Sequence, residues 1–143
     1  MNGDLLIDAG PLVALIDRSD DWHQRCRRTL ENLRAPLFTV WPAVAEASHI
    51  LKPVSRGQAT LMGLLATGIV EITSLDRDDI PRMRELMAKY HDLPMDLADA
   101  AIVRVAERQR IHRVFTTDQR DFQIYRPAHL GHFVLLPPTI SAA

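Results

Sequence analysis

Five short apolar runs alternate along the chain with longer segments in which apolar residues recur every three or four positions. Short apolar runs bounded by turn-forming residues are typical of buried strands, and the three-to-four spacing is typical of helices. The runs span residues 5–7, 36–40, 69–72, 113–117 and 133–136. Because strands that alternate with helices form a parallel sheet covered on both faces, we expect a single α/β domain over residues 1–143 with a five-stranded parallel sheet.

The ends of the predicted helices are set by cap-forming residues, prolines and glycine. Asp20 or Asp21 is a candidate N-cap for the second helix. Ser55 and Gln58 have the spacing of a capping box before the fourth helix, which Gly68 closes. The predicted helices cover residues 11–16, about 21–33, 42–52, 56–67, 78–90 and 96–109.

Composition excludes several classes of protein. The lone cysteine, Cys26, rules out an intramolecular disulfide and argues against a cysteine-based zinc site, which fits a reducing cytoplasm. The first residues lack the basic and apolar regions of a signal peptide. No segment approaches the ~20 apolar residues that a membrane span needs. We therefore expect a cytoplasmic protein with no membrane association.

Charge also limits the function. The formal net charge is −1, so overall basicity does not make this a protein that coats nucleic acid. The only lysines are Lys52 and Lys89, and arginine supplies the rest of the Lys and Arg residues. The planar guanidinium group of arginine suits phosphate groups. A general preference for arginine explains this equally well. A local basic rim around an acidic site remains open.

Four acids each lie at the edge of an apolar element: Asp8, Glu46, Asp99 and Asp118. Two of them directly follow predicted strands, and ligands of parallel α/β sheets bind at the carboxyl ends of the strands. Two carboxylates ~5 Å apart would repel by about 3 kcal/mol at an effective dielectric of 20, and a divalent cation would remove that cost. Oxygen ligands favour Mg²⁺ or Mn²⁺, one of whose waters can attack a phosphodiester.

Each acid also has a purely structural interpretation. Asp8 suits a strand-end turn, Glu46 an exposed helix position, Asp118 an Asx turn, and Asp99 the first turn of a helix. The hypothesis therefore depends on all four together. Among the neighbouring acids, Asp96 is best explained as the N-cap of the helix that contains Asp99, and Asp121 is a candidate secondary metal ligand.

Three stretches carry a resemblance to a known family: LLIDAGPLVALID, DLADAAIVRVAE and VFTTDQRDF. Together they resemble the PIN domain, in particular the VapC-type toxins of bacterial toxin–antitoxin pairs. The resemblance assigns the family's four acids to Asp8, Glu46, Asp99 and Asp118, which would be both catalytic and metal-binding. Thr116 matches the hydroxyl residue that supports the last acid, whereas Gly10 departs from the small polar residue of many members.

The resemblance implies an endoribonuclease that depends on Mg²⁺ or Mn²⁺ and cleaves an RNA substrate. It also implies a homodimer and inhibition by a VapB-type antitoxin. The alternative is a PIN-like scaffold that binds RNA or a protein without cutting it, for which the acid cluster would be unnecessary.

Other enzyme and signalling classes fit less well. A haloacid-dehalogenase phosphatase needs a second aspartate where Gly10 stands, and a response-regulator receiver needs a lysine after its last strand. The chain contains no P-loop or G-x-G-x-x-G motif, so nucleotide binding by those routes is unsupported. His129 and His132 lie in a proline- and glycine-containing loop that does not suggest a zinc site.

Overall fold

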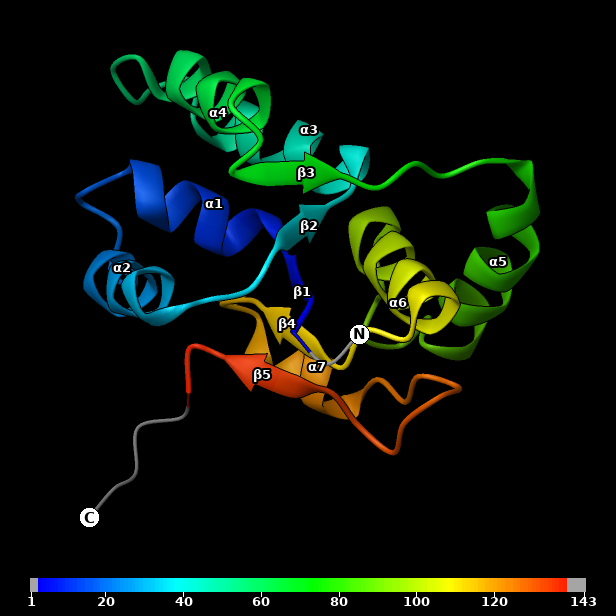
Figure 1. Ribbon diagram of the computed structural model, residues 1–143. Coiled ribbons are helices and arrows are strands. Elements are labelled where there is room, and N and C mark those ends of the chain that lie inside the picture. The colour runs from blue at the N-terminus through cyan, green and yellow to red at the C-terminus, as the bar shows by residue number, and fades with distance from the viewer. Residues whose placement is uncertain (1–2, 139–143) are drawn as a thin grey trace.

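A computed structural model describes residues 3–138 and contains, over that range, one five-stranded sheet. The strand order is β3-β2-β1-β4-β5, and every neighbouring pair is parallel (Figure 1). The strands are β1 (Leu5–Ile7), β2 (Leu37–Thr39), β3 (Val70–Ile72), β4 (Arg113–Phe115) and β5 (Val134–Leu136). The predicted α/β fold with a parallel sheet is confirmed. The first predicted strand is present with the same bounds, and the other four are slightly shorter than predicted.

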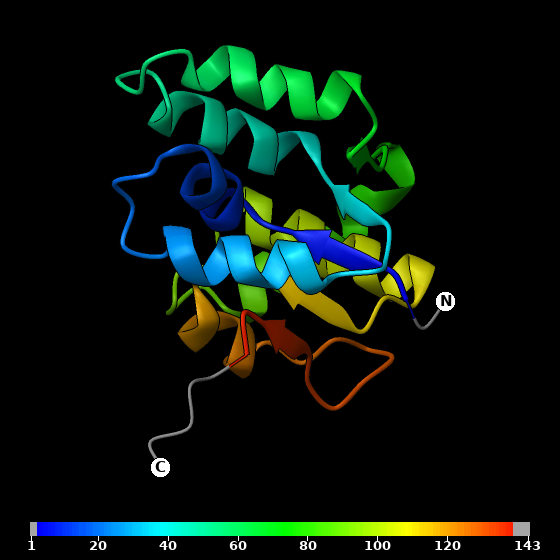
Figure 2. The ribbon, with the colours of Figure 1, turned by 60° about the vertical axis from the view of Figure 1, so that its left-hand side comes forward.

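The helices are α1 (Ala9–Ile16), α2 (His23–Asn32), α3 (Trp41–Ile50), α4 (Gly57–Ala66), α5 (Ile80–Lys89), α6 (Leu97–Gln109) and α7 (Gln119–Ile124), with a 3₁₀ turn η1 (Arg77–Asp79). They cover both faces of the sheet, as Figure 2 shows with α2 in front of β1 and α6 behind it. Successive strand residues point to opposite faces. Leu6 accordingly packs in the core cluster of α5, α6 and α7, whereas Leu5 and Ile7 pack in the cluster of α1, α2 and α4.

Helix α6 is the central helix of its face and is buried along most of its length. Its small and β-branched residues, such as Ala100, Ala101 and Val103, are completely shielded from solvent. The Asp96 side chain accepts a hydrogen bond of 2.8 Å from the backbone N–H of Asp99, so the predicted N-cap is confirmed. The capped end of α6 therefore lies at a fixed place in the fold.

The predicted capping box before α4 is wrong. The N-cap of α4 is Arg56, in the left-handed region at φ 59°, and no side chain caps the helix. The Gln58 amide instead donates to the backbone carbonyl of Ser48 at 2.9 Å. The cause is the tight turn between α3 and α4, where a Cβ on Gly57 would lie 2.9 Å from the carbonyl oxygen of Leu51.

Three further boundaries differ from the predictions. Helix α2 begins at His23, and Asp20 accepts a hydrogen bond from Trp22 in the turn before it rather than capping the helix. The segment predicted as one helix from residue 78 begins with η1, which Asp76 and Asp79 close with a capping box. Helix α7 was not predicted, because its six residues are too few to establish a periodic pattern. Over residues 3–138, no helix combines the length and apolar character that a membrane crossing requires.

Candidate active site

The loops that follow β1 and β4 are joined by a chain of hydrogen bonds. Asp8 is the N-cap of α1, and its backbone N–H donates to the carbonyl of Phe115 at the end of β4. The Thr116 hydroxyl donates to Oδ2 of Asp8 at 3.1 Å and accepts from the backbone N–H of Asp118 at 3.0 Å. Thr116 thus links two of the predicted acids, from strands that are neighbours in the sheet.

Asp99 lies in the first turn of α6 and is only 7% exposed. The phenol of Tyr125 donates a hydrogen bond of 2.7 Å to its Oδ2. Tyr125 is completely buried just beyond α7, in the same core cluster as α6, so this contact fixes the carboxylate from a second element of the core. Sequence reasoning missed Tyr125. A buried tyrosine needs a partner for its hydroxyl, but nothing in the sequence identifies that partner.

The short helix α7 brings a further acid to the site. Asp118 precedes α7 and Asp121 lies in its first turn. One carboxylate oxygen from each of Asp99, Asp118 and Asp121 lies within 4.8 Å of the others. The structure therefore groups two of the four predicted acids most tightly with Asp121, which the sequence suggested only as a secondary ligand.

Glu46 and Asp96 complete the acidic region. Glu46 is exposed on α3, which packs against α6, and Asp96 caps α6. Burial raises the pKa of Glu46, and the charges of Asp96 and Asp118 raise it further. The charge of Glu46 also raises the pKa of Asp8. Asp99 and Asp118 thus belong to the tightest group, Asp8 is linked to Asp118 through Thr116, and Glu46 lies outside that group but is near enough to influence it electrostatically.

The two buried acids hold protons far more strongly than free carboxyl groups. Burial raises the pKa of Asp8 to about 6, against hydrogen bonds from Ala9 and Thr116 that lower it. Burial raises the pKa of Asp99 to about 8, the Tyr125 hydrogen bond opposes this, and the Asp8 charge adds to it. Burial and the neighbouring Asp121 likewise raise the pKa of Asp118. The cluster is therefore strained whenever it is fully ionised, which favours a bound cation.

The donor set fits a hard divalent cation. Asp99, Asp118 and Asp121 offer carboxylate oxygens only. The single cysteine, Cys26, is buried in the core cluster of α1 and α2, away from these acids. Oxygen-only sites suit Mg²⁺ or Mn²⁺ better than Zn²⁺.

Gly10, which departs from the family pattern, has a structural explanation. A Cβ built on Gly10 would lie 2.0 Å from Oγ1 and 3.1 Å from Cβ of Thr117. Thr117 stands between Thr116 and Asp118, so its side chain fills, beside the acids, the space that a side chain at position 10 would take. The two residues are therefore complementary, and the departure leaves the acids in place.

Comparisons with known proteins agree with this geometry. The family model of the PIN domain matches residues 5–128. Ribonuclease VapC26 of Mycobacterium tuberculosis is 28% identical over 135 residues, which cover 93% of this chain and 100% of that protein.

Solved structures show the same fold. The toxin VapC20 of Mycobacterium tuberculosis, described as cleaving the sarcin–ricin loop, superposes with a TM-score of 0.73 at 15% identity, over 82% of this chain and 93% of that one. A toxin–antitoxin complex from Klebsiella pneumoniae gives a TM-score of 0.63 at 23% identity, over 82% and 89%. The family expected from the sequence motifs is thus confirmed: this chain belongs to the PIN domain family.

Proposed function

We propose that this chain is an endoribonuclease of the VapC type that requires Mg²⁺ or Mn²⁺ and acts as the toxin of a toxin–antitoxin pair. The observation that carries the proposal is the convergence of Asp99, Asp118 and Asp121 within 4.8 Å, next to a fourth acid, Asp8, that Thr116 holds in place. The similarity to Ribonuclease VapC26 supports RNA as the substrate.

The residues of the site have distinct roles in this proposal. Asp99, Asp118 and Asp121 would hold the metal ion, with Asp8 beside them. The chemistry that a divalent ion held by these residues would supply is activation of a water and neutralisation of charge on a phosphodiester. Glu46 is exposed at the rim, so it can accept a proton from a group that approaches from solvent.

The buried carboxylates suit this chemistry because they are fixed before a substrate arrives. Asp99 is held by Tyr125 and Asp8 by Thr116. A preorganised site of this kind does not have to reorient its dipoles during the reaction. Asp96 has a structural role, since its carboxylate caps α6.

The proposed partner is a VapB-type antitoxin, which the similarity to a toxin–antitoxin complex supports. An arginine or lysine of the antitoxin would enter the acidic region and compete with the metal. Ile50, 47% exposed, lies one helical turn after Glu46 and offers apolar anchoring on the same face of α3. Trp41, 56% exposed at the start of α3, offers a second apolar contact. A homodimer and a cytoplasmic location remain predictions from the sequence.

The direct test is cleavage of total cellular RNA by the purified chain. We expect cleavage with Mg²⁺ or Mn²⁺, none in excess EDTA, and none by Asp99→Asn in either condition. If wild-type protein cleaves equally well in EDTA, metal dependence is wrong. If it binds RNA equally with metal and with chelator and never cleaves it, the alternative of a non-catalytic scaffold is correct.

Toxicity is tested separately. Expression in bacteria should arrest growth unless the neighbouring antitoxin gene is co-expressed, and Asp99→Asn should relieve the arrest. Harmless expression of the wild-type chain, together with no small protein recovered in a pull-down, would contradict the toxin role and leave the nuclease role standing.

A further inference from the structure

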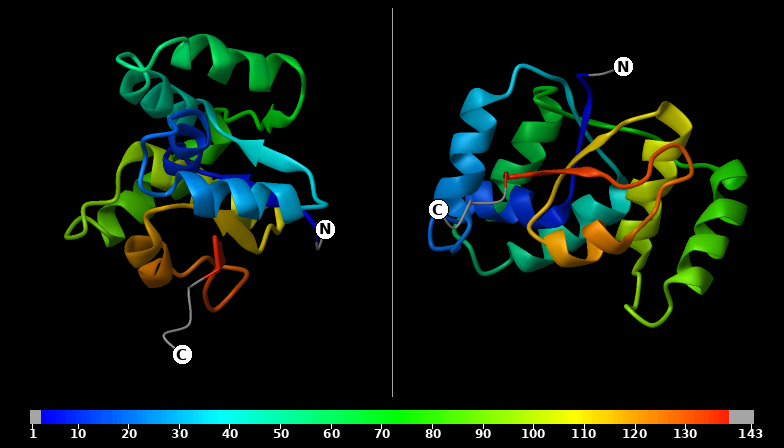
Figure 3. Two further views of the ribbon diagram at one scale, coloured as in Figure 1. Left: turned by 90° about the vertical axis from the view of Figure 1, so that its left-hand side faces the viewer. Right: turned by 90° about the horizontal axis from the view of Figure 1, so that it is seen from below.

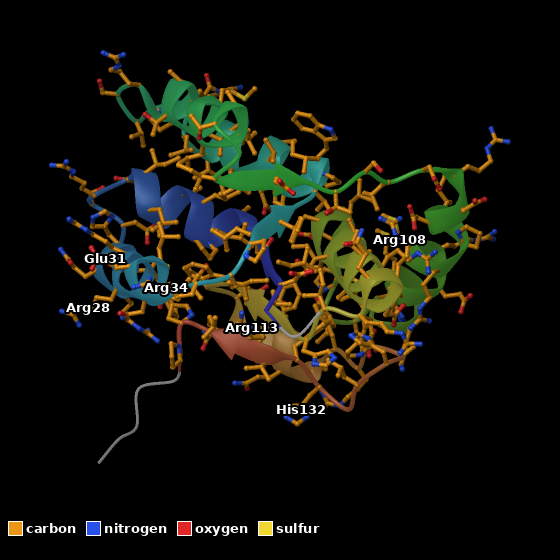
Figure 4. All side chains as sticks on the ribbon, viewed as in Figure 1. Arg28, Glu31, Arg34, Arg108, Arg113 and His132 are labelled. Atoms are coloured by element: carbon orange, nitrogen blue, oxygen red, sulfur yellow. The ribbon has the colours of Figure 1, made fainter. Side chains whose placement is uncertain are left out.

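A second polar site lies beside the acidic one, in a pocket between α2 and β5. Four hydrogen-bonding residues of α2 recur at positions i, i+3, i+4 and i+7, which places them on one face of the helix. The lining residues are Arg25, Arg28, Thr29, Asn32 and Leu33 of α2 and its end, Arg113 of β4, and Leu136, Pro137 and Pro138 at the end of β5. We call this the arginine pocket. Figure 4 labels Arg28 on α2 and Arg113 near β5.

The arginine pocket contains three guanidinium groups and no carboxylate among its lining residues. Arg113 donates one hydrogen bond, from Nη2 to the carbonyl of Gly3, and its Nε is buried without a partner among residues 3–138. Arg25 stacks over the ring of Trp22, with 4.2 Å from Cζ to the ring centroid. The neighbouring acid on α2, Glu31, is paired with Arg27. Among residues 3–138, no carboxylate therefore forms an ion pair with Arg25, Arg28 or Arg113.

Three arginines of α5 and α6 form ion pairs with carboxylates of the protein. Arg82 forms a two-bond pair with Glu107, at 2.8 Å for each bond. Arg104 and Arg108 both bind the buried carboxylate of Asp79, at 2.7 and 2.6 Å. These three arginines are structural, because internal carboxylates pair with them. Arg25 and Arg113 of the pocket instead donate to neutral carbonyls, those of Pro138 and Gly3, so their positive charge is left for an external anion.

Two hydrogen bonds connect the arginine pocket to the loop that carries the acidic site. The side-chain amide of Gln119, the residue after Asp118, donates to the carbonyl of Pro137 at 2.8 Å. The backbone N–H of Thr116 donates to the carbonyl of Leu136 at 2.8 Å. The segment that forms one wall of the pocket is thus hydrogen-bonded to the loop that carries Thr116 and Asp118. In the right-hand view of Figure 3, from below, α2 lies at the left, and β5 and α7 lie to its right.

We propose that the arginine pocket binds the phosphate groups of single-stranded RNA flanking the bond that is cut. This inference rests on the proposed ribonuclease function. Arginine forks match phosphate oxygens. The Asn32 amide donates one hydrogen bond to the carbonyl of Arg28 and has a second N–H to offer. Leu33, Leu136 and Pro137 give the pocket an apolar wall on which a sugar or base can lie. An RNA strand that crosses the Leu136–Pro137 segment would reach both the arginine pocket and the acidic site. This continuity favours RNA over an unconnected acidic peptide as the occupant of the pocket.

The test measures RNA affinity without cleavage. Asp99→Asn protein in EDTA is titrated with a fluorescein-labelled single-stranded RNA over a range of salt concentrations. Arg28→Gln and Arg25→Gln should each weaken binding about fivefold or more at low salt. Each lost phosphate contact should lower the slope of log K against log salt by about 0.7. Arg84→Gln, an exposed arginine on α5, is the matched control and should bind like the parent protein.

Two results would overturn the proposal. One is unchanged affinity and salt slope in both arginine variants, with thermal melting that shows them folded. The other is that the variants keep RNA binding but lose binding of a labelled poly-glutamate peptide, which would make the pocket a site for an acidic protein segment.

Cleavage by the wild-type chain separates this inference from the proposed function. If it cleaves RNA, Arg28→Gln should raise KM on long RNA with kcat unchanged. If the wild-type chain never cleaves RNA but the arginine variants still lose RNA affinity, the pocket stands and the nuclease function fails. If the wild-type chain cleaves RNA and the variants match it in affinity and KM, the pocket proposal alone fails.

Discussion

Tyr125 donates a 2.7 Å hydrogen bond to Oδ2 of Asp99 across the interface between α7 and α6. The tyrosine is completely buried and packs edge-on against Tyr90, with ring centroids 5.0 Å apart. The orientation of the Asp99 carboxylate therefore depends on a residue that never reaches solvent.

Tyr125→Phe should weaken metal binding while preserving the fold, because it removes one hydroxyl and keeps the ring. Loss of a partner that orients a metal ligand typically costs about 10- to 100-fold in affinity. The measurement is the Mn²⁺ concentration that gives half-maximal cleavage. Tyr90→Phe is the control, since its hydroxyl accepts from the Arg126 N–H rather than contacting an acid. Equal Mn²⁺ requirements in the two variants would contradict an orienting role.

Neutralising the acids should separate metal ligands from helix caps. Asp8→Asn and Asp99→Asn should abolish cleavage, and Asp121→Asn should reduce it at least tenfold, because Asp121 belongs to the tightest carboxylate group. Asp96→Asn should be mild, since asparagine also caps helices well. Initial rates at saturating Mn²⁺ provide the comparison. Asp96→Asn as inactive as Asp99→Asn would show that Asp96 does more than cap α6.

The metal-free protein should lose stability as the pH rises. The folded-state pKa values of Asp8 and Asp99 are about 6 and about 8, above the ordinary aspartate pKa of 3.8. A carboxyl group with a raised folded-state pKa gives its full stabilisation below its unfolded pKa and loses it as the pH passes its folded pKa. The Tm in EDTA should therefore fall by several degrees between pH 4 and pH 9.

Calorimetry of Asp99→Asn provides the matched comparison for this pH effect. The variant should melt higher than the wild type at pH 9 in EDTA, since a permanently neutral amide replaces a strained carboxylate, and its Tm should depend less on pH. A Tm of wild-type protein that rises from pH 5 to pH 9 in EDTA would show that these acids are not strained in the fold.

Gly10 and Thr117 should behave as a coupled pair. Gly10→Ala places a methyl group 2.0 Å from the Thr117 hydroxyl, and overpacking of this kind costs about 1–3 kcal/mol. Thr117→Ala in the same chain removes that oxygen and should recover most of the loss. Urea unfolding of both single variants and the double variant measures the coupling. Strictly additive effects would mean that the two side chains do not compete for one space.

The sequence predicts the sheet because its strands are short, continuous and apolar, and it predicts Asp8 and Asp99 because each follows or opens such an element. Residues whose role depends on distant contacts escape this reasoning. The sequence suggests Asp121 only as a secondary ligand, because it reaches the site through α7, whose six residues give no periodic signal. The partner of Tyr125 is 26 residues away. At Ser55 the local capping signal is overridden by the turn from α3 into α4.

Helix α6, shielded along most of its length, should be among the last segments to exchange its amide hydrogens with solvent. Helix α7 is short, and its fully buried anchor is the single residue Phe122. We therefore expect the backbone that carries Asp99 to exchange its amide hydrogens more slowly than the backbone that carries Asp121. The acidic site would then join one carboxylate from a highly protected helix to another from a short, less protected one.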